Sequence, residues 1–164
     1  MPNPSDSRRE AILDGIVTYL RGIDGNPDYY FDFASNTQLV QRFRLKAPTE
    51  FPCLVVRALE EELIGNILAG AVPLLQFDFK FAIEIMTMDV ESTAPESIEK
   101  LIHDVRKKLL STEAIRTHSR SVITTELTSI SEPQISEVAN GYITATIFGL
   151  VRHNIQSSNP SQST

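Results

Sequence analysis

The residue types that usually carry catalysis or bind metals are few and scattered in this chain. Its three histidines, His103, His118 and His153, have no second histidine or cysteine at a spacing that suits zinc ligands. His103 is followed by Asp104, but adjacent residues on a helix point about 100° apart and do not form a dyad. We interpret this pair as polar helix surface. The histidines therefore predict neither a metal site nor a catalytic dyad.

The sole cysteine, Cys53, lies within the apolar run 51–56. A thiol in such a run behaves as a small hydrophobic group. A catalytic thiol would need a neighbouring base and an electropositive, partly open setting, and nothing near Cys53 suggests either. We predict that Cys53 is a core residue. One cysteine cannot crosslink the fold, which indicates a reducing compartment.

Acidic side chains offer a weaker route to chemistry. Asp78, Glu84 and Asp89 lie along or just after one expected strand, and paired carboxylates do serve glycoside hydrolysis. Charges on a solvated strand face are the commoner explanation. The sequence has no glycine-rich phosphate loop after a strand and no nucleophile-elbow motif. It therefore predicts a protein that is not an enzyme, with no catalytic residue, no bound cofactor and no metal ligand.

The charge balance restricts the partners. A net charge of −6 over 164 residues argues against a broad nucleic-acid-binding face, which needs clustered lysine and arginine. The basic run 106–108 falls in the last turns of an expected helix, where cations suit the helix dipole; a DNA-contact patch is the alternative. The polar start has no signal-peptide core, and no apolar run approaches the roughly 18 residues of a membrane helix. These features predict a soluble, cytoplasmic protein.

Hydrophobic periodicity predicts two helices and five strands. The helices are expected over 8–21 and 93–110, and the strands over 37–45, 51–58, 75–85, 122–130 and 142–153. The first two strands are close enough in sequence to pair as a hairpin. The predicted fold class is α+β: an antiparallel sheet with two helices, in the order α-β-β-β-α-β-β. Composition predicts disordered ends at 1–6 and 155–164 around a single domain, 7–154.

Residues 59–73 fit neither the helical nor the strand period, so we interpret them as a long loop. The segment contains the acidic run Glu60, Glu61 and Glu62, which is followed by five larger aliphatic residues. Long loops in compact domains are usually functional or mobile. Apolar residues in such a loop either fold back on their own core or meet a partner.

The order of these pieces resembles the tail-terminator (tail-completion) proteins of long-tailed bacteriophages. The resemblance rests on an opening helix, a strand entry followed by acidic residues, a long strand that runs into a helix, and a closing strand; in this sequence these are 11–20, 51–56 with 60–62, 77–89 with 98–106, and 142–152. It spans most of residues 8–154. The segment 111–120 departs from the family, which usually has a glycine-containing turn there.

The resemblance implies an α+β fold and a ring of six subunits. Such a ring caps the tail tube, ends its polymerisation and joins it to the head–neck connector. The implied partners are copies of the chain, the tail tube protein and the connector protein; DNA passes through without specific binding, and no membrane is involved. The implied location is the tail–head junction of the virion, after assembly in the host cytoplasm. The alternatives are a neck or connector protein of the same particle and a small-molecule-binding or enzymatic α+β domain.

Two surface hypotheses follow from an expected ring. Glu60, Glu61 and Glu62 would face the channel, because like charge keeps a DNA duplex from adhering. The aliphatic residues of the loop would contact the adjacent subunit or the tail tube; these are Leu63, Ile64, Ile67, Leu68 and Val72. In the alternative, Leu63, Ile67 and Leu68 pack against the second helix of their own domain.

Overall fold

The structure is a computed structural model that describes residues 8–42, 48–69, 72–88, 94–110, 122–135 and 142–156. In chain order its elements are α1 (Arg8–Leu20), the 3-10 helix η1 (Thr37–Leu39), β1 (Val40–Gln41), β2 (Cys53–Ala69), β3 (Val72–Met88), α2 (Ala94–Leu110), β4 (Val122–Ile130), β5 (Gln134–Ile135) and β6 (Tyr142–Gln156). The chain is therefore α+β, as predicted, and the order of its main elements follows the predicted order.

The strands form one sheet in the order β1-β2-β3-β6-β4, and β5 also pairs with β6. All pairings are antiparallel except that of β1 with β2, so the sheet is mixed. The predicted hairpin between 37–45 and 51–58 is therefore wrong. Among the described residues of 37–45, only Val40 and Gln41 form a strand, and Arg21, directly after α1, donates two N–H groups to the Val40 carbonyl at 2.9 and 3.2 Å. Residues 43–47 lie outside the described part of the chain.

The predicted loop over 59–73 is also wrong, because β2 and β3 are paired almost to their connection. The ladder runs from Cys53 opposite Met86 to Ala69 opposite Val72. It shifts register twice, between Ala58 and Glu61 and again between Leu63 and Gly65. Extra residues at such bulges break the alternation of side chains between the two faces. This is why a long strand carries no strand period in its sequence.

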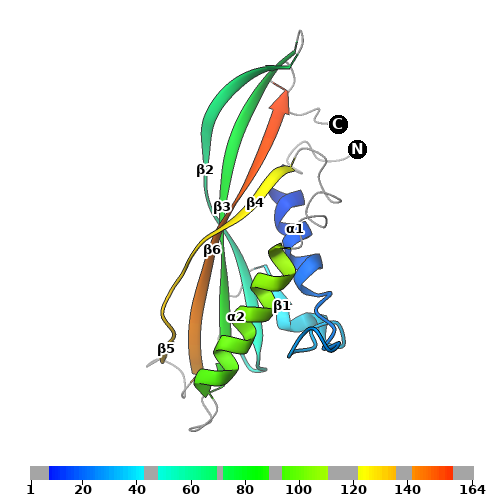
Figure 1. Cartoon of the computed structure of the whole chain (residues 1–164), viewed down its shortest axis with the longest axis vertical. Helices are drawn as coiled ribbons and strands as arrows, with labels where there is room; N and C mark the ends of the chain where they lie inside the picture. Colours follow the sequence, from blue (N-terminus) through cyan, green and yellow to red (C-terminus); the bar gives the residue numbers. More distant parts are fainter. Residues whose placement is uncertain are drawn as a thin grey trace.

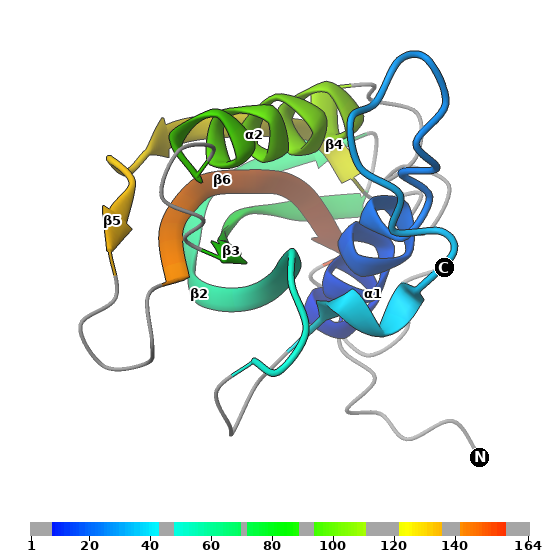
Figure 2. The ribbon, with the colours of Figure 1, turned by 90° about the horizontal axis from the view of Figure 1, so that it is seen from below.

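The molecule is elongated, and the helices cover only part of the sheet. In Figure 1 the strands β2, β3 and β6 run along the long axis and twist strongly, and their upper ends extend beyond both helices. Seen along that axis, α2 lies over β3, β6 and β4, while α1 lies beside β1 and β2 (Figure 2). We call the face of the sheet that the helices cover the inner face, and the opposite one the outer face.

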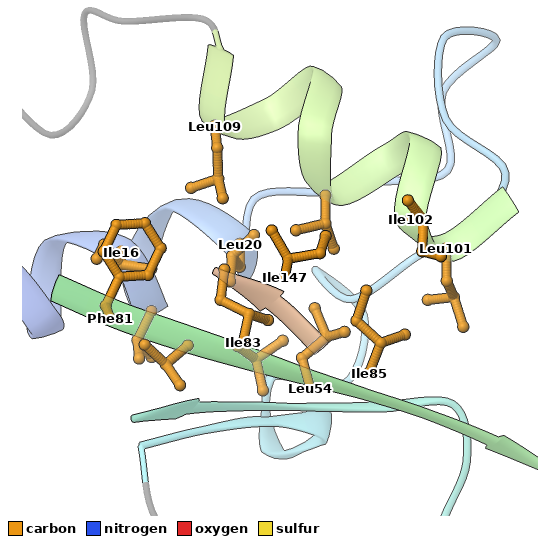
Figure 3. Close-up of a cluster of buried hydrophobic side chains, with 14 of the residues drawn as sticks. Ile16, Leu20, Leu54, Phe81, Ile83, Ile85, Leu101, Ile102, Leu109 and Ile147 are labelled. Carbon is orange, nitrogen blue, oxygen red and sulfur yellow. The ribbon is translucent and has the colours of Figure 1, made fainter. Parts of the chain in front are cut away.

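The main hydrophobic core lies between the helices and the inner face. Figure 3 shows it as a continuous layer of aliphatic and aromatic side chains from both helices and three strands; the labelled ones are Ile16, Leu20, Leu54, Phe81, Ile83, Ile85, Leu101, Ile102, Leu109 and Ile147. Alternation along β3 sends every second residue into this layer. Cys53 is buried as predicted, but it belongs to a smaller separate cluster with Val55 and Met86.

The segment between α1 and η1 is fixed to α2 by Asp104. This carboxylate is fully buried and accepts the backbone N–H groups of Tyr30 and Phe31 at 2.8 and 2.9 Å. Burial raises its pKa, and the two backbone hydrogen bonds act against that shift. Our interpretation of the 103–104 pair as polar surface is therefore wrong for Asp104 and right for His103, which is exposed. The buried carboxylate of Asp104 thus anchors the segment before η1 to α2.

Two further expectations concern the ends of the chain and membranes. Ile155 and Gln156 continue β6, so the predicted disordered tail begins too early by at least these two residues. Residues 1–7 and 157–164 lie outside the described part. Within the described part, neither helix has the length and apolar character needed to cross a membrane.

Candidate functional site

The projecting end of the β2–β3 pair differs from the rest of the sheet. We call residues 59–69 of β2 and 72–79 of β3 the distal hairpin, and the remaining described chain the body. The strands of the hairpin stay paired up to Ala69 and Val72, and β6 borders β3 along this stretch. The hairpin is thus a paired but bulged extension of the sheet.

The distal hairpin exposes aliphatic side chains. Leu59, Leu63 and Ile64 have 42%, 55% and 39% of their surface accessible, whereas Leu54 on the same strand is fully buried. On the partner strand, Phe77 is only half-buried. An aliphatic side chain left in water forgoes roughly 1.5–3 kcal/mol that full burial would provide. An apolar surface on a projecting element indicates contact with a partner.

These exposures bear on the residues predicted to form an interface. Leu63 and Ile64 are both exposed on β2, and Leu63 does not pack against α2, so that alternative does not hold for this residue. Ile67, Leu68 and Val72 lie close to the tip, where their backbones are paired in the ladder. Their side chains are outside what the structure describes. The hairpin brings the backbones of all five predicted residues together, and their role as an interface stays a prediction.

Two of the three acidic residues share the outer face at the base of the hairpin. Glu60 and Glu62 flank Lys80 of β3, with carboxylate oxygens 2.5 and 3.7 Å from its Nζ. Both acidic side chains are largely exposed. The hydrogen bond from Lys80 lowers the pKa of Glu60, which keeps this carboxylate charged.

Glu61 lies on the inner face, because successive residues of a strand point to opposite sides. Its Oε2 is 2.9 Å from Nε2 of His153 on β6, and most of its side chain is covered. The three glutamates therefore do not form one acidic surface. A channel-facing role remains a hypothesis for Glu60 and Glu62, while Glu61 has a partner within its own chain.

His153 is fully buried at the point where the hairpin leaves the body. Its ring stacks on Phe77, with the ring centroids 5.8 Å apart and the planes inclined by 20°. Burial lowers the pKa of His153 and the nearby Arg8 acts in the same direction, whereas Glu61 and, more weakly, Asp78 raise it. A neutral imidazole can donate Nε2–H to the Glu61 carboxylate, which leaves Nδ1 without a partner among the described residues.

The first turn of α1 fastens this base from the other side. The guanidinium of Arg9 lies over the Phe79 ring, 5.2 Å from its centroid, and donates to the Leu59 carbonyl at 3.3 Å. Arg8 is half-buried beside it, and burial lowers its pKa. The base of the hairpin is thus held by α1, β3 and β6 together.

Asp78 and Glu84, two of the carboxylates considered for catalysis, form ion pairs with arginines on the outer face. Asp78 is buried and accepts two hydrogen bonds from the Arg152 guanidinium, at 2.8 and 2.9 Å. Glu84 pairs with Arg57. Asp89 lies outside the described residues. The described carboxylates therefore neutralise neighbouring arginines across adjacent strands and do not converge on a shared site.

Other surfaces of the body offer little that is suited to chemistry. A shallow groove of about 400 Å³ follows one flank of α2, between the exposed side chains of His103, Arg106 and Leu110. Within the described ranges, no group of three or more histidine, cysteine or acidic side chains could hold a metal ion. The distal hairpin is thus the candidate functional site.

Sequence reasoning missed the Glu61–His153 pair. The available signal was the position of His153 two residues after the apolar Val151, on the alternating residues of β6 that enter the core.

No protein-family model matches this chain, and no curated protein is significantly similar to it.

Proposed function

We propose that this protein forms a closed ring that caps a phage tail tube, ends its polymerisation and joins it to the head–neck connector. The observation that carries the proposal is the distal hairpin, a paired extension of the sheet that exposes Leu59, Leu63 and Ile64. The resemblance of the order of elements to tail-terminator proteins supplies the biological role.

A ring fits the asymmetry of the molecule. Exposed aliphatic side chains stand on different surfaces of the molecule, Leu63 on β2 and Ile130 on β4, and a contact between two different surfaces of identical copies is heterologous. Heterologous contacts close into a ring when the rotation between neighbours divides a full turn. The proposed ring has six copies, and its partners are the tail tube protein and the connector protein.

The proposed channel surface is the outer face, where Glu60 and Glu62 stand around Lys80. The chain as a whole carries a net charge of −6. Negative charge on a channel wall would let DNA pass without adhering. A ring structure with Glu60 and Glu62 on its outer rim would contradict this part of the proposal.

The test is the mass of the purified protein in solution over a range of concentrations, combined with electron micrographs. We expect a monomer when dilute and a ring of six copies when concentrated. A closed ring of another symmetry would favour a connector protein of the same particle. A compact dimer, or a monomer at all concentrations that does not bind tail tubes, would contradict the proposal.

A pair of variants tests whether the hairpin is the interface. Replacing Leu63 and Ile64 together with serine should abolish assembly and leave the melting temperature of the monomer nearly unchanged. The matched control is Leu110→Ser at the end of α2, which removes a side chain of similar exposure from the body and should assemble normally. A large drop in monomer stability for the double variant would instead show that the hairpin belongs to the core.

A further inference from the structure

Two margins of the sheet are open. On one side, β1 pairs only with Leu54 and Val55 of β2, so the rest of β2 is bordered by a described strand on one side alone, that of β3. On the other side, β4 pairs with β6, and no described strand borders its second margin. Along 63–69 of β2 and 124–130 of β4, these margins present backbone N–H and C=O groups that no described strand pairs, and such groups can pair with a strand of another chain.

The direction of the strands suits these two margins to each other. β2 is antiparallel to β3, β3 to β6, and β6 to β4, so β4 runs opposite to β2. Rotation about a ring axis that lies roughly along the strands preserves their direction. The β4 margin of one copy would therefore meet the β2 margin of the next as an antiparallel pair, the more stable type of ladder.

The residues of the two margins favour pairing more than they oppose it. Residues 122–130 of β4 contain one charged side chain, Glu126, and no proline or lysine. Residues 63–69 of β2 contain no charged residue and no proline. Charged side chains and prolines are common means by which proteins block such edges. Exposed aliphatic side chains also stand on both margins, at Leu63 and at Ile130.

Charge repulsion indicates the register. Glu126 pairs with Leu150 of β6, and Leu150 pairs on its other side with Lys80 of β3. Because Lys80 contacts Glu60, the two glutamates of one chain lie at a similar height along the strands. A level contact between neighbours would place like charges near each other, which destabilises cross-strand pairing. A stagger toward the hairpin tip removes this conflict, and sheets that close around an axis require a stagger in any case.

We propose that β4 of one subunit, over residues 124–130, adds as an antiparallel strand to residues 63–69 of β2 in the next subunit, so that the sheet continues around the ring. This inference rests on the proposed ring and assigns its subunit contact. In this register Ile130 lies opposite Leu63 of the neighbour, and the exposed side chains of the two margins cover each other.

Cross-linking tests the contact directly. A chain with both Leu63→Cys and Ile130→Cys should react with a short bis-maleimide, in its assembled state, to give a ladder of covalent oligomers that ends at the size of the ring. The matched control carries Leu63→Cys and Thr18→Cys, the latter on the exposed side of α1, and should remain largely monomeric on a denaturing gel. The wild-type chain, whose sole cysteine is buried, controls for Cys53.

Hydrogen exchange of the unmodified protein gives a second measurement in case the cysteine variants do not assemble. In the ring, about every second amide of residues 124–130 should lose its fast exchange, because alternate N–H groups point away from β6. Residues 63–69 should slow in parallel. Rings that form with unchanged exchange in both segments, or with no cross-linking above the control, would overturn the strand pairing and leave the ring intact. Failure of the wild-type protein to form rings would overturn both.

Discussion

The strands β2 and β3 run through both the body and the distal hairpin, yet β2 buries apolar residues in the body and exposes them in the hairpin. In the body, Leu54 of β2 faces α1 and α2 and is fully buried. Nine positions later Leu63 also stands on the inner face, opposite Phe77, but more than half of its surface is exposed. An apolar strand face that its own chain leaves exposed is typical of a surface that contacts another molecule.

The two regions also differ in how polar groups are used. Ion pairs are spread over the body, whereas those of the hairpin lie at its base, where Glu60 pairs with Lys80 and Glu61 contacts His153. Beyond Leu63, the part of β2 that the structure describes makes no ion pair. The base therefore fixes the direction of the hairpin while the tip presents apolar surface. The predictions that follow test this division, beginning with the largest expected effect.

The sharpest test compares two leucines of one strand. Leu54→Ala should lower the free energy of unfolding by roughly 2–5 kcal/mol, because it leaves a cavity in the main core. Leu63→Ala should change it by no more than about 0.5 kcal/mol in the monomer, as expected for an exposed site. Denaturant titration of dilute protein measures both. Equal losses would mean that the hairpin folds as part of the core.

Two glycines give a second comparison. A Cβ at Gly149 of β6 would lie 2.5 Å from Cζ of Phe81 and 2.8 Å from the Glu126 carbonyl oxygen, whereas a Cβ at Gly65 would meet nothing within 4 Å. Gly149→Ala should therefore cost roughly 1–3 kcal/mol through overpacking. Gly65→Ala should leave the melting temperature unchanged. A tolerated Gly149→Ala would show that the sheet shifts easily under the helices.

The same division explains which parts of the fold could be read from the sequence. The predicted strands 75–85 and 142–153, with one wet and one dry face, keep their period of two and lie within β3 and β6. The strand 122–130 was predicted correctly from its threonine and isoleucine content, although its pairing with β6 shifts register twice. The two helices were found from their apolar stripes, with bounds within two residues of those observed. Regular burial on one face is the condition for this success.

The distal hairpin lacks that condition. Two bulges move its side chains between faces, and no core selects an apolar face, so its sequence resembles a loop. The Glu61–His153 contact joins residues 92 positions apart, and its existence depends on the register of three strands. The run 60–62 indicated an acidic surface, but its local sequence could not show that the strand splits the run between two faces.

Removal of the Glu61 side chain should lower the free energy of unfolding by no more than Gly149→Ala does. Glu61→Ala leaves the buried Nε2 of His153 without an acceptor, which should cost roughly 1–3 kcal/mol. Glu62→Ala, on the exposed outer face one residue later, is the matched control and should leave stability unchanged. Thermal melts of both variants at neutral pH check this. A stable Glu61→Ala variant would show that water replaces the carboxylate and that the base of the hairpin is open.

The smallest effect expected is a dependence of stability on pH that originates at His153. Burial lowers the pKa of this imidazole in the folded protein, whereas the unfolded chain titrates near the ordinary value of about 6.5. Between these two pKa values the unfolded state binds more protons, so stability falls as the pH drops below about 6.5 and levels off below the folded pKa. Denaturant midpoints measured from pH 7 to pH 5 should show this decline in the wild type. His153→Gln should flatten it, whatever the variant's stability at pH 7, and His103→Gln on the exposed face of α2 should retain it. An equal slope in His153→Gln would mean that protonation at the hairpin base does not oppose folding.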